Sequence, residues 1–158
     1  MTMHLHGVLI WGFFATIVLT TIEAMGRGLG LTRMDVPFIL GTMFTSHRDR
    51  AKWIGFLVNL VNGWIFALFY IAAMEASGIK HWWFGMIIGL VQACFVMTVV
   101  TTTLPAFHPR MASEEWGPDP THQLEPPGAF ALNYGKRTPL VTVFAHLIYG
   151  GILGLFYR

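Results

Sequence analysis

Long hydrophobic runs separated by polar stretches dominate the pattern along the chain. A helix rises about 1.5 Å per residue, so roughly 20 apolar residues are needed to cross the hydrocarbon core of a bilayer. Four runs of about that length occupy residues 5–25, 53–75, 82–104 and 139–157. The pattern therefore predicts one all-α membrane domain with four transmembrane helices.

The second and fourth runs resemble each other. Residues 59–70 align without gaps with residues 146–157, and six of the twelve positions are identical. The first and third runs align more weakly, with Gly7 over Gly85 as one matching pair. The pattern predicts two duplicated helical hairpins of the same orientation, related by a pseudo-two-fold axis along the membrane normal. Similarity that arises from shared apolar composition is the alternative.

Small and polar residues recur on one face of each of these two runs, at the spacing of a helical stripe. The stripes are Asn59, Asn62, Gly63, Phe66 and Tyr70 in the second run, and His146, Tyr149, Gly150, Leu153 and Tyr157 in the fourth. Glycine permits close approach of membrane helices, and an amide or imidazole in hydrocarbon needs a partner. We therefore expect both stripes in the bundle core. Gly85-x-x-x-Gly89 and Gly150-x-x-x-Gly154 are expected to pack closely as well.

Two long polar segments, 26–52 and 105–138, connect the runs. In the first, Asp35 followed by Val36, Pro37 and a short apolar stretch predicts a capped helix that lies in the membrane interface. An extended loop against the bundle is the alternative. In the second, prolines predict irregular structure over residues 106–128. Its aromatic residues favour docking on the bundle or on a neighbouring subunit; they are Phe107, Trp116, Phe130 and Tyr134.

Basic residues gather in these two segments. They are Arg27, Arg33, Arg48, Arg50 and Lys52 in the first, and Arg110, Lys136 and Arg137 in the second. The opposite side of the predicted membrane carries Lys80 and Arg158. Because basic residues favour the cytoplasmic side, we expect both long loops in the cytoplasm and both termini on the outer, periplasmic side.

The composition agrees with a membrane protein and excludes other classes. The chain is 54% hydrophobic and 11% charged, and its mean hydropathy is +0.57, outside the range of soluble domains. The basic residues lie at helix ends, so they imply no nucleic-acid partner. The expected partners are the lipid bilayer and other membrane subunits or further copies of the chain. The single cysteine excludes an internal disulfide and chemistry between paired thiols.

His146 is the most informative candidate for a site, because it falls near the middle of the fourth run. A histidine at that depth is a functional hypothesis by default. With Asn59 at the equivalent place in the second run, it could hold a haem, a chlorophyll-type pigment or a quinone. The equivalence with Asn59 favours instead a polar residue that forms a hydrogen bond across the bundle.

Glu23, near the cytoplasmic end of the first run, is the second candidate. His47 and His108 are expected at the same level of the membrane, so the three residues could bind a divalent metal. No close ligand spacing such as H-E-x-x-H accompanies them. We favour an ion pair between Glu23 and Arg27, one turn along the same helix.

These features predict a non-catalytic integral membrane subunit or accessory protein that packs within a larger complex and requires no cofactor. A cofactor-binding module centred on His146 is the alternative. A small transporter ranks third, because transporters usually bury several ionisable residues at the midplane and only His146 lies there. The chain has no nucleophile elbow and no phosphate-binding loop, so an enzyme is not expected.

Three short motifs carry a resemblance that covers most of the chain. They are P-A-F-H-P-R-M over 105–111, G-A-F-A-L-N-Y-G over 128–135 and H-L-I-Y-G-G-I-L-G over 146–154. With them the chain resembles a family of small, uncharacterised bacterial four-helix membrane proteins. The resemblance implies a four-helix fold and the bacterial cytoplasmic (inner) membrane, and it implies no catalytic residue.

Overall fold

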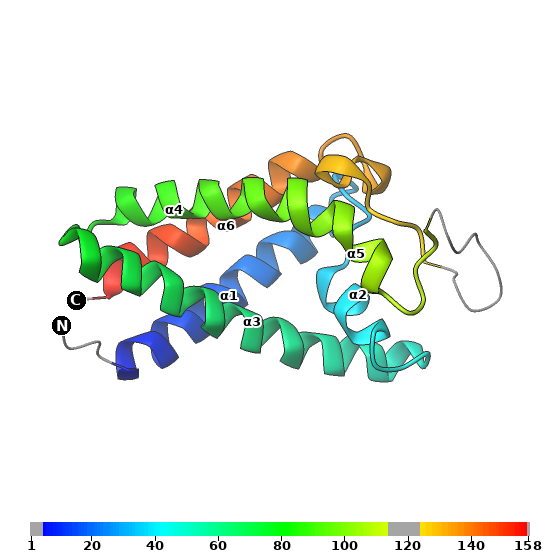
Figure 1. Ribbon diagram of the computed structural model, residues 1–158, viewed down its shortest axis with the longest axis horizontal. Coiled ribbons are helices and arrows are strands. Elements are labelled where there is room, and N and C mark those ends of the chain that lie inside the picture. The colour runs from blue at the N-terminus through cyan, green and yellow to red at the C-terminus, as the bar shows by residue number, and fades with distance from the viewer. Residues whose placement is uncertain (1–4, 114–123, 158) are drawn as a thin grey trace.

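The computed structural model describes residues 5–113 and 124–157, and helices dominate it (Figure 1). Within these residues, four helical segments are long and apolar enough to cross a membrane. They are α1 (Leu5–Gly28), α3 (Arg48–Ser77), the third span (Trp82–Phe107) and α6 (Thr138–Phe156). The third span changes type along its length, from α4 (Trp82–Phe95) through the π-helical turn η1 (Val96–Val100) to α5 (Thr101–Phe107). The predicted all-α architecture with four helices of membrane-spanning length is confirmed.

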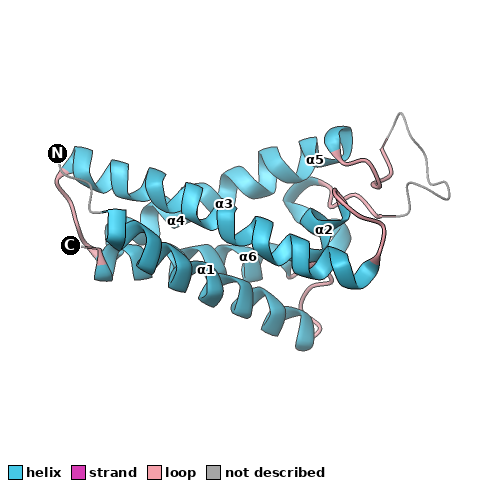
Figure 2. Ribbon diagram, turned by 90° about the horizontal axis from the view of Figure 1, so that it is seen from below, coloured by secondary structure: helices cyan, strands magenta, loops and turns pink. Residues whose placement is uncertain are grey.

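The long helices form an up-and-down bundle (Figures 1 and 2). Helix α1 packs between α3 and α6, and α6 packs between α1 and α4. A short connection over residues 78–81 joins α3 to α4, after which the two helices diverge toward the far end of the bundle (Figure 1). The start of α1 and the end of α6 lie at the end with this connection, and the two long loops lie at the other end (Figure 1).

Glycines allow α4 and α6 to approach until their backbones touch. A Cβ atom on Gly85 would overlap the carbonyl oxygen of Gly150, and a Cβ atom on Gly150 would overlap that of Gly85. Gly89 lies against the backbone of His146 in the same way. The two G-x-x-x-G patterns therefore form a close helix contact, as the sequence predicted.

The two stripes face the bundle interior to different degrees. All five members of the α6 stripe are buried. In the α3 stripe, Asn59 and Tyr70 are buried, whereas Asn62, Gly63 and Phe66 are partly exposed. The core position of the stripes is thus confirmed fully for α6 and partly for α3. The duplication of the hairpins and its symmetry axis stay predictions.

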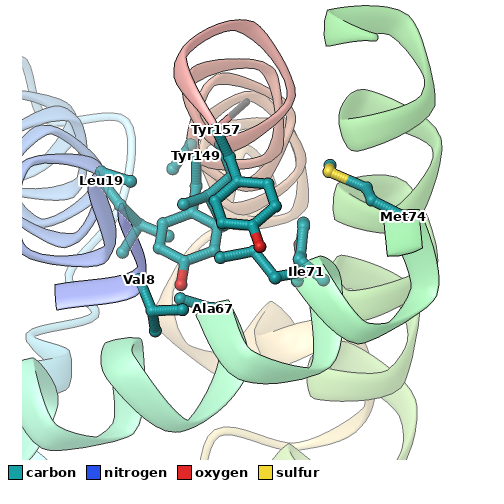
Figure 3. Close-up of a cluster of buried hydrophobic side chains, with 11 residues drawn as sticks. Val8, Leu19, Ala67, Ile71, Met74, Tyr149 and Tyr157 are labelled. Atoms are coloured by element: carbon teal, nitrogen blue, oxygen red, sulfur yellow. The ribbon is translucent and has the colours of Figure 1, made fainter. Parts of the chain in front are cut away.

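Three buried tyrosines contribute to the bundle core. The rings of Tyr70 and Tyr149 meet edge to face, with centroids 5.3 Å apart. Tyr149 of α6 and Tyr157, the residue directly after that helix, belong to a cluster that includes Val8 and Leu19 of α1 (Figure 3). The tyrosine hydroxyls donate hydrogen bonds: Tyr70 to Gln92, Tyr149 to the carbonyl of Gly63, and Tyr157 to Glu75. A buried tyrosine needs such a partner, and here the bonds also join different helices.

The short helix α2 (Val36–Thr42) lies at the end of the bundle that carries the long loops (Figures 1 and 2). Asp35 caps its first turn by accepting a hydrogen bond of 3.2 Å from the backbone N–H of Phe38, which confirms the predicted cap. Helix α2 packs directly on α3, since a Cβ atom on Gly41 or on Gly55 would overlap a carbonyl oxygen of the other helix. Its location in a membrane interface stays a prediction.

The residues after α5 return to α2 and bind its last turn. His108 is buried, and its Nε2 lies 3.0 Å from the carbonyl oxygen of Ile39. The guanidinium of Arg110 donates a hydrogen bond to the carbonyl of Thr42. The last carbonyl groups of a helix have no partner inside that helix, so these contacts satisfy them and hold α2 in place.

The second long loop is irregular over most of its described length, as its prolines predicted. Helix α5 extends to Phe107, and the short 3-10 helix η2 (Ala129–Tyr134) precedes α6. Tyr134 is buried, whereas Phe107 and Phe130 are exposed. Trp116 lies outside the described residues. Docking of this loop on a neighbouring subunit stays a prediction.

Candidate functional site

A cavity of about 150 Å³ lies among α1, α3, the third span and α6, with residues of and before α2 at one end. Its polar lining residues are Thr16, Glu23, Asn59, Asn62, Gln92, His146 and Tyr149. Its other lining residues are Leu19, Met34, Val36, Leu40, Gly63, Phe66, Val96 and Val100. Polar groups inside a membrane bundle are costly unless they are paired, so such a concentration marks a candidate site.

Glu23 of α1 brings a carboxyl group to this cavity. The residue is 4% exposed, and its Oε2 is buried without a hydrogen-bond partner among the described residues. The expected ion pair with Arg27 is not formed, because the chain after α1 folds back and places another carboxylate beside that guanidinium. Arg27 Nη2 lies 3.5 Å from Asp35 Oδ2, and its Nη1 donates to the carbonyl of Met34.

His146 of α6 lines the cavity and is 5% exposed. Its Nδ1 lies 2.8 Å from the carbonyl oxygen of Thr142, one turn earlier in the same helix. A carbonyl oxygen only accepts, so Nδ1 carries the ring proton and Nε2 presents a lone pair. The hydrogen bond that the sequence predicted across the bundle is therefore replaced by one within α6.

Helix α3 contributes the two amides of its stripe. Asn59 donates from Nδ2 to the hydroxyl of Thr20 on α1, at 2.9 Å. This residue does join two helices, which is the role its sequence position suggested. Asn62 lines the cavity one turn further along α3 and forms no hydrogen bond with another described residue.

Gln92 of α4 is a lining residue that the sequence analysis did not single out. Its Oε1 accepts a hydrogen bond of 2.6 Å from the hydroxyl of Tyr70. That bond leaves the amide N–H groups of Gln92 free to donate hydrogen bonds to a molecule in the cavity. The available signal was a single amide side chain inside an otherwise apolar span, because polar side chains at that depth are rarely without a role.

Tyr149 and Thr16 complete the polar lining. The hydroxyl of Tyr149 donates to the carbonyl of Gly63 at 2.6 Å, and that of Thr16 donates to the carbonyl of Gly12 at 2.7 Å. Both hydroxyl protons are therefore committed to the backbone. The oxygens keep lone pairs that can accept a hydrogen bond.

The π-helical turn η1 forms one wall of the cavity. Val96 and Val100, its first and last residues, both line the space. A π-turn widens a helix locally and is frequent at functional sites. A threonine hydroxyl forms a hydrogen bond with the backbone of the turn: Thr101, the residue after it, donates to the carbonyl of Met97 at 2.6 Å. The distortion thus coincides with the polar cavity.

Glu23, His47 and His108 do not come together. Among residues 5–113 and 124–157, no group of three or more His, Cys, Asp or Glu side chains is close enough to hold a metal ion. His47 is exposed at the start of α3, and His108 binds the end of α2. Burial lowers the pKa of His108, which favours the neutral ring. Glu23 instead shares a cavity with His146 and Asn59.

A second hollow, of about 280 Å³, lies between the end of α1 and the start of α6. It is lined by Ile22, Met25, Gly26, Leu29, Leu31, Leu140, Val141 and Phe144. These side chains offer no hydrogen-bonding group. Candidate chemistry is therefore found in the polar cavity.

Comparison of the chain with protein-family models, with curated proteins and with solved structures finds no match. The resemblance drawn from the three short motifs stays a prediction.

Proposed function

We propose that the chain is a membrane-embedded binding module whose polar cavity holds the headgroup of a lipid-soluble ring compound of the quinone type. One observation carries the proposal: Glu23 and His146 line the same intramembrane cavity, and Glu23 Oε2 is buried without a partner among the described residues. An unpartnered carboxylate is expensive in hydrocarbon, so the group needs a proton, a cation or a hydrogen-bonding ligand.

The size of the cavity favours a small ring over a large cofactor. Pockets for drug-sized ligands usually enclose roughly 300–1,000 Å³, and this one encloses about 150 Å³. A porphyrin or chlorophyll macrocycle would require the surrounding helices to move apart. A single substituted ring, with its apolar tail outside, requires much less rearrangement.

The walls favour a ligand that arrives from the bilayer. On one side they consist of Asn62 and Phe66 of α3, and on the other of Val96 and Val100 of η1, all partly exposed. These two helices diverge at this level of the bundle (Figure 1). We propose that a polar headgroup enters between these helices while its tail stays in lipid.

Binding of a short-chain quinone or of its reduced quinol tests this proposal. The purified protein in detergent is equilibrated with each compound, and the bound fraction is measured after separation. We expect binding of at least one form, and we expect Glu23→Leu and His146→Leu each to weaken it about tenfold or more. His81→Leu is the matched control, because His81 is exposed and directly precedes α4, whose start lies at the opposite end of the bundle from α2 (Figure 1). Absence of binding by both forms would overturn the proposal.

The outer faces of the bundle bear on the accessory role that the sequence favoured. Large apolar side chains cover these faces, among them Trp53, Phe69, Val91 and Leu140. Lipid or another subunit can cover such faces. We therefore keep packing within a larger membrane complex as a second proposal, tested by whether the native protein co-purifies with a defined membrane partner in mild detergent.

We also propose the bacterial inner membrane as the location, with both long loops in the cytoplasm. The excess of Lys and Arg in those loops supports this orientation. A reporter active only in the cytoplasm is expected to work when inserted near Gly117 and to fail when fused after Arg158. The reverse pattern contradicts the orientation.

A further inference from the structure

The hydrogen-bonding groups of the cavity do not divide evenly into donors and acceptors. Tyr149 and Thr16 have donated their hydroxyl protons to backbone carbonyls, at 2.6 Å and 2.7 Å. A hydroxyl whose proton is committed can only accept from a ligand. The hydroxyls of Tyr149 and Thr16 can therefore act only as acceptors toward a ligand.

His146 has the same bias, and so has Glu23 when its carboxyl group is ionised. The ring proton of His146 is on Nδ1, bonded to the Thr142 carbonyl, so the neutral ring offers Nε2 as an acceptor. Glu23 offers two acceptor oxygens when ionised, and when it carries a proton it offers one O–H donor and one acceptor oxygen. Its Oε2 has no partner among the described residues. The neutral ring of His146 and the ionised carboxyl group of Glu23 therefore both need a donor.

The amides adapt to either role and do not reverse this bias. Asn59 donates one N–H to the hydroxyl of Thr20 at 2.9 Å, and its side-chain carbonyl oxygen remains available to accept a hydrogen bond. Asn62 can donate or accept. Gln92 leans toward donation, because its oxygen already accepts from Tyr70. Groups restricted to accepting thus outnumber the one that leans toward donating, and they come from α1 and α6.

We infer that the cavity selects a ring compound bearing hydroxyl donors, such as a quinol or another aromatic diol, over the corresponding quinone. This inference rests on the proposed function. A quinol donates hydrogen bonds from two O–H groups, and His146 Nε2 and the ionised carboxyl group of Glu23 can accept them. A quinone presents two carbonyl acceptors, which would face lone pairs and leave those buried groups unsatisfied.

A direct comparison of the two forms of one compound tests the selectivity. A decyl-substituted benzoquinol and the benzoquinone with the same ring and tail are each equilibrated anaerobically with the purified wild-type protein, and their dissociation constants are compared. We expect the quinol to bind at least about tenfold more tightly, since hydrogen bonds to a buried carboxylate and imidazole are lost with the quinone.

Variants identify the groups responsible. His146→Phe removes the Nε2 acceptor and is expected to reduce the ratio of the two dissociation constants at least about threefold. The control His81→Phe, far from the cavity, is expected to leave the ratio unchanged. Binding of either form by a variant also serves as the folding check, because it shows that the cavity is intact. Equal binding of both forms to the wild type, or preference for the quinone, overturns the selectivity and leaves the proposed function standing. Failure of both forms to bind overturns both.

Discussion

The stripes of α3 and α6 have similar sequences but different surroundings. In α6, Gly150 lies against the backbone of α4, and every member of the stripe is buried. In α3, the equivalent Gly63 lies against the side chain of Thr16, and it and its neighbours Asn62 and Phe66 line the cavity. One pattern has therefore produced a close helix contact in one place and a wall of a polar cavity in the other.

The difference comes from the neighbours of each helix. Helix α6 is held between α1 and α4, so both flanks of its stripe are covered. Helix α3 is covered by α1 and α2, while the third span diverges from it (Figure 1). Small residues permit close packing, but they require a facing helix at the right distance to achieve it. In α3, Gly63 faces a side chain of α1 and no neighbouring backbone, and the residues beside it line the cavity.

The largest expected effect distinguishes the two glycines of these stripes. Gly150→Ala should lower the free energy of unfolding by about 1–3 kcal/mol, because the new methyl group meets the carbonyl of Gly85 and the helices must separate. Gly63→Ala should cost less, because the group it meets is the side chain of Thr16. Denaturation in mild detergent measures both values.

A second substitution sharpens this contrast. Thr16→Ala in the Gly63→Ala background should recover part of the lost stability, because it removes the obstructing hydroxyl and methyl groups. Gly28→Ala is the control, since no atom lies within 4 Å of its added methyl group. If Gly63→Ala costs as much as Gly150→Ala and Thr16→Ala gives no recovery, the two glycines are not in different environments.

The next effect concerns His146 and Asn59, the first residues of the two stripes. His146→Leu should cost about 0.5–2 kcal/mol, because the remaining polar groups of the cavity then face an apolar side chain. His146→Asn should be milder, because Asn supplies both a donor and an acceptor and already occupies the equivalent place in α3. Thermal unfolding of the two variants is the measurement. A larger loss with Asn than with Leu would contradict the equivalence of the two positions.

A smaller effect is expected from the bond that ties the stripes together. Tyr149→Phe removes the hydrogen bond from α6 to the carbonyl of Gly63 on α3 and should cost about 0.5–1.5 kcal/mol. Tyr70→Phe removes the bond to Gln92 and should cost a similar amount. The two rings are in contact, so the double variant should deviate from additivity. Strict additivity in denaturation experiments would indicate that they act independently.

The smallest effect concerns pH and the end of α2, which borders the cavity. Burial lowers the pKa of His108 below its ordinary value of about 6.5. The unfolded chain therefore takes up the proton first, so stability is complete above about pH 6.5 and falls as the pH drops toward the folded-state pKa. Unfolding should be easier at about pH 5 than at about pH 7.5. His108→Gln should weaken this dependence, and an unchanged pH profile would exclude His108 as its source.

The candidate site was only partly predictable. His146 and Asn59 were identified because a polar residue in a hydrophobic run is conspicuous, and Gln92 carried the same signal. Glu23 was identified but was assigned the wrong neighbours. Its grouping with His47 and His108 assumed that residues at one level of the membrane meet, whereas helix rotation and loop path determine which side chains face each other.

The sequence by itself determined the features that depend on neighbours along the chain. The four spans, the capped start of α2 at Asp35, the close packing of the two G-x-x-x-G faces and the inward position of the α6 stripe all follow from patterns of neighbouring residues. Tertiary structure alone decided that Arg27 binds Asp35, that α3 and the third span diverge, and that Glu23 shares a cavity with His146. The physical reason is range: hydrophobic spacing fixes which face of a helix is buried, whereas the partner of that face depends on how distant segments compete for the same space.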